Sequence, residues 1–180
     1  MTEPLEPNAP TNAREQPLDA RAFGARIAAW DDDLRGVAWA VVRTQTATDD
    51  VMQDAYERAF KARHTFDGRS SMKTWLHSIV YRTAIDYVRR EGRRSADPLD
   101  GLLHAPATDS ASSPTDDALA RAELDAVLDA CTPEQSAMLL LTAGLGYSFD
   151  ETAEILGINR GTVASRVSRL RSRLTRWDDD

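Results

Sequence analysis

The chain has 180 residues, of which 42% are hydrophobic and 28% charged, and its formal net charge is -7 at pH 7. This composition predicts a globular protein and excludes a disordered polymer or a fibrous repeat. No apolar run, the one from Met138 to Leu141 included, approaches the roughly 20 residues of a membrane span, and the start of the chain predicts no signal peptide. A single cysteine, Cys131, excludes an intramolecular disulfide and a multi-cysteine zinc site. We expect a small buried cysteine and a cytoplasmic protein.

The charges are segregated along the chain. Residues 68–94 carry seven basic and two acidic residues, and residues 158–177 carry six arginines and no acid. Between them, residues 95–130 carry eight acidic residues and one arginine. The negative net charge is therefore an average that includes two basic patches. This layout is suited to binding a polyanion at two places. Solvated arginine-rich helix faces with no ligand are the alternative interpretation.

Composition also predicts the domain organisation. Residues 1–19 are rich in Pro, Asn and Glu, and we expect a disordered tail there. Residues 95–117 combine Pro, Gly and Ser with acidic residues and are expected to form a flexible acidic linker. This leaves two modules, 20–94 and 118–177, and an acidic end at 178–180. Each module is small for a hydrophobic core of its own, so we expect a larger assembly.

Hydrophobic periodicity predicts that both modules are all-α. In the first module, apolar residues recur at helical spacing from Leu34 to Val42. A second helix is expected to begin near Thr48, with Asp49 and Asp50 in its first turn, and to end before Gly68. A third begins near Ser70 or Ser71. One face of this third helix is apolar from Leu76 to Val88, and another presents Arg82, Asp86, Arg89 and Arg93 at helical spacing.

The second module has clear helix boundaries. Thr132 to Gln135 and Ser148 to Glu151 both match the capping box, in which the two side chains satisfy each other's backbone N–H groups. The second box opens a short helix that we expect to end at Gly157, because glycine readily adopts positive φ. A longer arginine-rich helix follows after Asn159. This succession predicts a helix-turn-helix, whose second helix would read the major groove of DNA. A helical hairpin that serves packing alone is the alternative.

At this point the residues resemble a known family. Residues 145–174, LGYSFDETAEILGINRGTVASRVSRLRSRL, resemble region 4 of bacterial sigma factors, which reads the -35 promoter element. Residues 49–60, DDVMQDAYERAF, resemble region 2.2, and residues 66–76, FDGRSSMKTWL, with 84–90, AIDYVRR, resemble regions 2.3 and 2.4. A short linker in place of region 3, and no region 1.1, is typical of the extracytoplasmic-function (ECF) group of alternative sigma factors.

The resemblance implies partners and site residues. It implies promoter DNA, core RNA polymerase (the β′ clamp for region 2 and the β flap for region 4) and an anti-sigma factor, with no enzymatic activity and no cofactor. The residues carried over for melting and reading the -10 element are Arg69, Ser70, Ser71, Lys73, Arg82, Asp86, Arg89, Arg90 and Arg93. Those for the -35 element are Arg160, Thr162, Ser165, Arg166, Arg169 and Arg173. Those for polymerase binding are Asp49, Asp50, Gln53 and Asp54.

Some positions qualify these expectations. Tyr81 is a candidate for stacking on an unstacked base, whereas Trp75 and Tyr87 also fit core positions. The family often has asparagine just before Ala84, where this chain has Thr83, so the -10 sequence preference is not carried over. Ala164 replaces a usual basic residue, and we expect one phosphate contact fewer there.

Two other function classes stay open at this point. The second module alone resembles the output domain of response regulators. In a further hypothesis that involves no DNA, the chain is a helical adaptor that binds an acidic partner protein. A regulator has no need of the block from Asp49 to Arg94. An adaptor predicts that charge reversal of Arg166 and Arg169 leaves promoter activity intact.

Overall fold

The computed structural model describes residues 19–95 and 125–174, and within these ranges the regular structure is helical, with no strand. The expected all-α class is therefore confirmed. The first module contains α1 (Ala20–Ala29), α2 (Asp31–Val42), α3 (Gln45–Ala62), a short 3₁₀ turn η1 (Arg63–Thr65) and α4 (Met72–Ser95). The second contains α6 (Pro133–Leu139), the π-helical turn η2 (Leu140–Gly144), α7 (Phe149–Leu156) and α8 (Arg160–Leu174). The expected tail, linker and acidic end lie almost wholly outside the described residues.

Helix boundaries follow local chemistry. Both predicted capping boxes are present, and Gly157 ends α7 in the left-handed conformation at φ 68°. The predicted start of α3 near Thr48 is wrong, because Thr44 is the N-cap and its hydroxyl accepts from the N–H of Ala47. The helix dipole favours a carboxylate most within the first turn. Asp49 consequently lies beyond that favoured part of α3. Ser71 caps α4 as expected, accepting from the N–H of Thr74.

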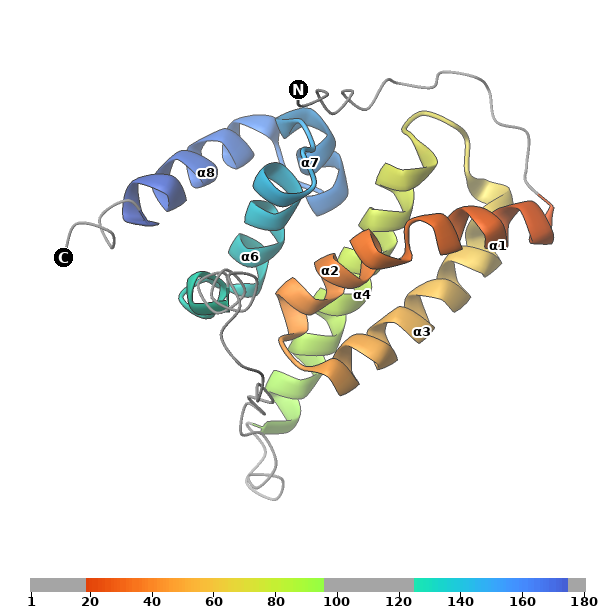
Figure 1. Ribbon diagram of the computed structural model, residues 1–180, viewed down its shortest axis with the longest axis horizontal. Coiled ribbons are helices and arrows are strands. Elements are labelled where there is room, and N and C mark those ends of the chain that lie inside the picture. The colour runs from red at the N-terminus through yellow and green to blue at the C-terminus, as the bar shows by residue number, and fades with distance from the viewer. Residues whose placement is uncertain (1–18, 96–124, 175–180) are drawn as a thin grey trace, which may run out of the picture.

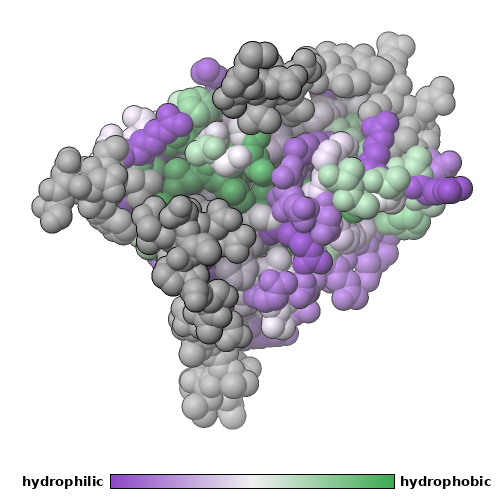
Figure 2. Space-filling view, in the orientation of Figure 1, coloured by the Kyte–Doolittle hydropathy of each residue, from purple (hydrophilic) through white to green (hydrophobic). Residues whose placement is uncertain are grey.

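The core lies where α2, α3 and α4 meet and extends into the second module (Figure 1). The predicted apolar stripe of α2 is buried at Leu34, Val37, Ala38 and Val41. Met138 and Leu141, from α6 and η2, are fully buried in the same cluster because α6 packs on α2 and α7 packs on α4. In Figure 2, hydrophilic side chains gather over α2 and α4, and an apolar area lies over α6 and α7. The two modules therefore share one hydrophobic core.

Two features bear on ligands and membranes. Within 19–95 and 125–174, no group of three or more His, Cys, Asp or Glu side chains is placed to hold a metal ion. Among the same residues, no helix is both long enough and apolar enough to cross a bilayer.

Cys131, expected to be buried, is instead partly exposed, and Arg173 donates to its sulfur at 3.6 Å.

Candidate nucleic-acid and polymerase interfaces

The basic edge of α4 is exposed to solvent. Arg82, Asp86, Arg89, Arg90 and Arg93 are all exposed, whereas Leu76, Val80 and Ala84 on the opposite face are buried. The helix is amphipathic in the way the sequence predicts, and the packing of its apolar face fixes the direction of the basic edge. The structure therefore brings five of the nine residues predicted for the -10 element onto one exposed edge.

Carboxylates of the same module hold part of this edge. Arg58 on α3 lies 3.7 Å from the Asp86 carboxylate and donates to the hydroxyl of Thr83 at 3.3 Å. Arg90 lies 3.8 Å from Asp54. Such half-exposed pairs contribute little stability, about 0–1 kcal/mol each, but they orient long side chains. Sequence reasoning missed Arg58 because its partners are about 25 residues away and no local pattern marks it.

The loop before α4 turns at Gly68, whose φ is 71°. Arg69 on this loop is 89% exposed and pairs with its neighbour Asp67 at 2.9 Å, which leaves it accessible to a phosphate. Ser70 is half-buried, and the Ser71 hydroxyl is engaged as the cap of α4. Of the two serines predicted to bond a base edge, only Ser70 has a hydroxyl with no role in helix capping.

Aromatic side chains underlie this loop. The Trp75 ring lies 6.4 Å from Phe23 and 5.5 Å from Phe66, and Phe23 also contacts Phe60. Trp75 is half-buried and serves as a packing residue in this cluster, in line with the core position that its spacing also allowed. Phe60, 44% exposed, is the large apolar side chain that this cluster leaves in solvent.

Lys73 and Tyr81 lie apart from the exposed edge. The Lys73 ammonium pairs with Asp33 on α2 at 2.6 Å and lies 5.9 Å from the Tyr147 ring of the second module. Tyr81 is only 8% exposed, and burial raises the pKa of its hydroxyl. The second module therefore covers two residues that were expected to face DNA.

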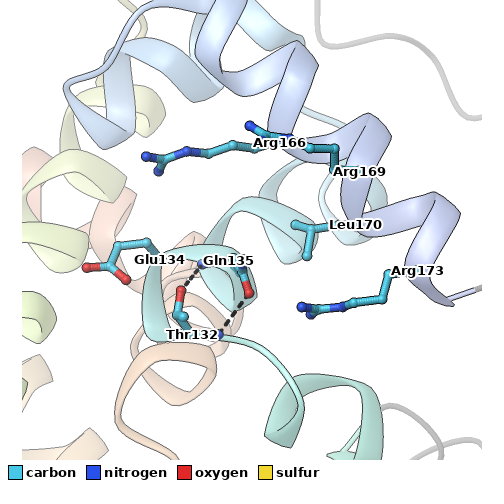
Figure 3. Close-up of a pocket in the computed structure, with 7 residues that line it drawn as sticks. All are labelled: Thr132, Glu134, Gln135, Arg166, Arg169, Leu170 and Arg173. Carbon is cyan, nitrogen blue, oxygen red and sulfur yellow. Dashed lines mark hydrogen bonds between the residues drawn. The ribbon is translucent and has the colours of Figure 1, made fainter.

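The predicted helix-turn-helix is formed by α7, Gly157 and α8. Val163, Val167 and Leu170 of α8 are buried, and their burial turns the arginines outward. Arg166, Arg169 and Leu170, together with Arg173, line an open groove of about 650 Å³ facing the first turn of α6 (Figure 3). Arg169 donates to the Ser165 carbonyl and Arg173 to the Ala130 carbonyl. In the described chain none of these three arginines pairs with a carboxylate.

The remaining -35 residues lie at the start of α8. Arg160 pairs with Asp150 on α7 at 3.3 Å, with both side chains mostly exposed. Ser165 is exposed and donates to the Thr162 carbonyl at 3.1 Å. Because both side chains of the Arg160–Asp150 pair are mostly exposed, Arg160 can readily exchange Asp150 for a phosphate. All six residues predicted for the -35 element therefore come from one helix, and Arg160, Ser165, Arg166 and Arg169 among them are exposed.

The acidic residues of α3 divide between two neighbours. Asp49 accepts from Arg35 at 2.6 Å and from Gln45, and these bonds lower the pKa of its carboxyl. Gln53, Asp50 and Asp54 line a second groove, of about 300 Å³, opposite Tyr87 and Arg90 of α4. The predicted polymerase-binding set thus adjoins the predicted -10 edge, and Arg90 belongs to both surfaces.

Comparison with known families matches both modules in order. The family described as Sigma-70 region 2 matches residues 27–94, and the one described as Sigma-70, region 4 matches residues 121–174. A curated relative, the ECF RNA polymerase sigma factor SigX of Bacillus subtilis, is 32% identical over 148 residues, covering 78% of this chain and 75% of the relative. SigM of Mycobacterium tuberculosis, also an ECF sigma factor, is 33% identical over 159 residues, covering 88% of this chain and 78% of the relative.

Solved structures share the fold. The sigma factor RpoE of Bartonella quintana, in complex with the anti-sigma factor NepR, aligns with a TM-score of 0.69 at 24% identity, over 87% of this chain and 96% of that one. CnrH, in complex with the cytosolic domain of CnrY, aligns with a TM-score of 0.64 at 26% identity, over 89% and 90%. Both alignments span more of the chain than either module alone.

Proposed function

Because the chain belongs to the extracytoplasmic-function group of sigma factors, we propose that its two basic helices divide promoter recognition, α4 binding the -10 element and α8 the -35 element. As a sigma factor it directs core RNA polymerase to promoters. Sigma factors are transcription factors rather than enzymes, and we propose that this one has no catalytic activity and acts in the cytoplasm with the polymerase.

At the -35 element, α8 would enter the major groove by its N-terminal half. Arginine is well suited to this role, because its planar guanidinium bonds guanine or phosphate in a bidentate way. Arg166 and Arg169 are exposed without carboxylate partners among the described residues, so no ion pair has to break when they bind. Arg160, Thr162 and Ser165 complete the surface at the start of the helix, and Arg173 adds a contact towards its end.

At the -10 element, the loop before α4 would capture an unstacked base. Unstacking costs a few kcal/mol, which contacts to the extruded base and its phosphates must offset. Arg69 is placed to hold a phosphate and Ser70 to bond a base edge, while the exposed edge from Arg82 to Arg93 would hold the adjoining duplex. Lys73 would join them when its ammonium exchanges Asp33 of α2 for a phosphate.

Polymerase binding would use the exposed side of α3. Asp50, Gln53 and Asp54 line one groove, and carboxylate and amide oxygens there can accept hydrogen bonds from the β′ clamp. Asp49 is held by Arg35, so we propose that the pair meets the polymerase as a unit. The β flap would contact the second module. RpoE, which shares this fold, was solved in complex with the anti-sigma factor NepR, and an anti-sigma partner is part of our proposal for this chain.

The observation that carries the proposal is the helix-turn-helix with unpaired arginines on a chain that also carries region 2. The test is in vitro transcription with purified core polymerase on a promoter library, alongside co-purification with core. We expect initiation at a defined promoter subset only when the chain is added. The absence of both initiation and co-purification would contradict the assignment.

Two variants separate the alternatives. A regulator without polymerase binding predicts that Asp50→Lys/Asp54→Lys leaves initiation unchanged, whereas we expect loss of core binding. An adaptor predicts that Arg166→Glu/Arg169→Glu leaves initiation unchanged, whereas we expect loss of -35-dependent initiation with core binding retained.

A further inference from the structure

Polar side chains meet along the seam between α3 and α4, which pack side by side and run in opposite directions (Figure 1). Asp50, Asp54 and Arg58 are spaced four residues apart, so they share one side of α3. Asp50 and Asp54 line the smaller groove against α4, where Asp54 lies 3.8 Å from Arg90. The charges are reversed at the next position, where α3 supplies the base, Arg58, and α4 supplies the acid, Asp86. This side of α3 is therefore acidic along the groove and basic beside the middle of α4.

Two groups of α4 hold the Arg58 guanidinium. The Thr83 side chain is fully buried, and its hydroxyl donates to the Ile79 carbonyl at 2.8 Å. The hydroxyl oxygen can still accept, and Arg58 Nη1 donates to it at 3.3 Å. The same Nη1 lies 3.7 Å from the Asp86 carboxylate. A long side chain held at its end in this way has lost part of its rotamer freedom before a ligand binds, so binding costs less entropy.

The opposite edge of the same guanidinium is open, because both contacts use one nitrogen. Among the described residues, neither Nε nor Nη2 of Arg58 has a hydrogen-bond or ion-pair partner. These two N–H groups are parallel and form a donor fork that can bond two neighbouring acceptors at once. The side chain is 46% exposed, which leaves room for a ligand at this fork. Arg58 therefore offers a pair of donors whose position is set by α4.

The Arg58 guanidinium lies beside the basic edge of α4. Asp86 belongs to that exposed edge together with Arg82 and Arg89, and Thr83 directly follows Arg82. Because Arg58 contacts Thr83 and Asp86, it adjoins the surface proposed to hold promoter duplex. The pair also offsets the negative charge of Asp86, which would otherwise repel a phosphate at this point. A duplex bound along α4 would therefore meet Arg58 of α3 as well.

Guanine is the base whose major-groove edge fits such a donor fork. Its O6 and N7 atoms are neighbouring acceptors, and a bidentate arginine is the commonest specific contact to them. A phosphate can be met from many directions by a freely moving arginine, whereas reading a base edge requires a side chain of fixed position. The two contacts that fix Arg58 therefore favour a base over a phosphate.

We propose that Arg58 determines specificity at the -10 element: its Nε and Nη2 donate to O6 and N7 of one guanine in the duplex that α4 holds. Thr83 and Asp86 are positioning residues, which act on the base only through Arg58. The inference rests on the proposed function, because it requires that α4 binds the -10 element. The two can fail separately, since a -10 preference that does not depend on Arg58 would contradict this inference alone.

The test is in vitro transcription by holoenzyme on promoters randomised across the -10 element and the adjoining upstream base pairs. We expect the wild-type chain to prefer guanine at one position of one strand. Arg58→Lys keeps the charge but replaces the fork by one ammonium, and it should reduce that preference about 5- to 100-fold. Preferences at the other positions should be unchanged. Lys61→Arg makes the reverse exchange three residues further along α3, on a side chain 75% exposed and paired with Glu57, and should alter no preference.

Several results of this experiment would overturn the proposal. An unchanged guanine preference in Arg58→Lys would mean that Arg58 contacts a phosphate or only joins α3 to α4. An equal loss of initiation at every promoter sequence would mean that the substitution disturbs packing. Loss of binding to core polymerase would place Arg58 in the polymerase interface, because it lies on the same side of α3 as Asp54. A wild-type chain with a -10 preference that includes no guanine would also overturn it, whereas no -10 preference at all would contradict the proposed function of α4 too.

A double-mutant cycle tests whether Asp86 acts through Arg58. Asp86→Ala should reduce the guanine preference about three- to tenfold in the wild-type background and have no further effect in Arg58→Lys. Additive losses of preference would mean that Asp86 reads a base itself.

Thr83 is tested by a pair of substitutions. Thr83→Val removes the hydroxyl that accepts from Arg58, at nearly the same side-chain volume, and should reduce the guanine preference several-fold. Thr83→Ser keeps the hydroxyl and should keep the preference. Equal preferences in the two variants would overturn the positioning role of Thr83, because only the hydroxyl distinguishes them in their contact with Arg58. Circular dichroism and the urea midpoint establish that each variant is folded.

Discussion

The basic surfaces of α4 and α8 are built differently. On α4, carboxylates stand beside the arginines: Asp86 lies on the exposed edge and pairs with Arg58 of α3, and Arg90 pairs with Asp54 of α3. On α8, Arg166 and Arg169 have no carboxylate partner in the described chain and border an open groove. The first arrangement orients side chains for a defined geometry, and the second leaves charge available to phosphate. Since α4 carries Asp86 and Glu91 among its arginines and α8 carries no acidic residue, we expect α8 to contribute more of the electrostatic attraction to DNA, whereas α4 depends more on being positioned.

The largest expected effect tests whether the two modules share one core. Leu141 of η2 is fully buried in the cluster that includes α2, so Leu141→Ala should lower the free energy of unfolding by about 2–5 kcal/mol. Urea denaturation followed by tryptophan fluorescence measures it, with Trp177→Phe in both chains so that Trp30, Trp39 and Trp75 report on the first module. A midpoint unchanged in that module would show that the modules unfold independently.

The next effect compares the two arginine surfaces directly. Arg166→Ala should reduce -35-dependent initiation about 10- to 100-fold, because an unpaired arginine contact to DNA is worth about 1–3 kcal/mol. Arg90→Ala should cost only a few-fold, since Arg90 is already shared with Asp54. Initiation rates and core affinity are measured on the same promoter. Equal losses of initiation from the two substitutions would contradict the proposed difference between α4 and α8.

The sequence predicts α7 and α8 well because their boundaries are local. A capping box spans four residues, and Gly157 alone accounts for the end of α7. The start of α3 is harder to predict because Thr44 and Thr48 are both good caps four residues apart, and packing decides between them. The docking of the modules is not predictable from local pattern, since His77 and Tyr147 are 70 residues apart. For the same reason, Lys73 matches the expected -10 set in sequence and yet lies in an interface.

A smaller effect concerns pH and the interface between the modules. Burial lowers the pKa of His77 from its ordinary 6.5, opposed by the Lys73 carbonyl and by Asp33. The unfolded chain therefore binds the proton more readily. Stability is full above about pH 6.5, falls as the pH drops below that value, and levels off once the pH passes the folded-state pKa. Urea denaturation from pH 7.5 to 5 should show this slope reduced in His77→Gln and unchanged in the exposed control His64→Gln.

The smallest effect is a gain at α8. Ala164 stands where the family usually has a basic residue, one turn before Ser168, and it is only half-buried. Ala164→Arg should add one phosphate contact, which tightens DNA binding a few-fold and steepens the dependence of log affinity on log salt by about 0.9. Glu57→Gln changes the net charge equally but lies on α3, so it should leave the slope unchanged. A gain in affinity without a steeper slope would mean that the new arginine contacts the protein rather than a phosphate. The difference between α8 and α4 would then lie in the shape of the groove that α8 lines, and not in the charge that α8 offers to phosphates.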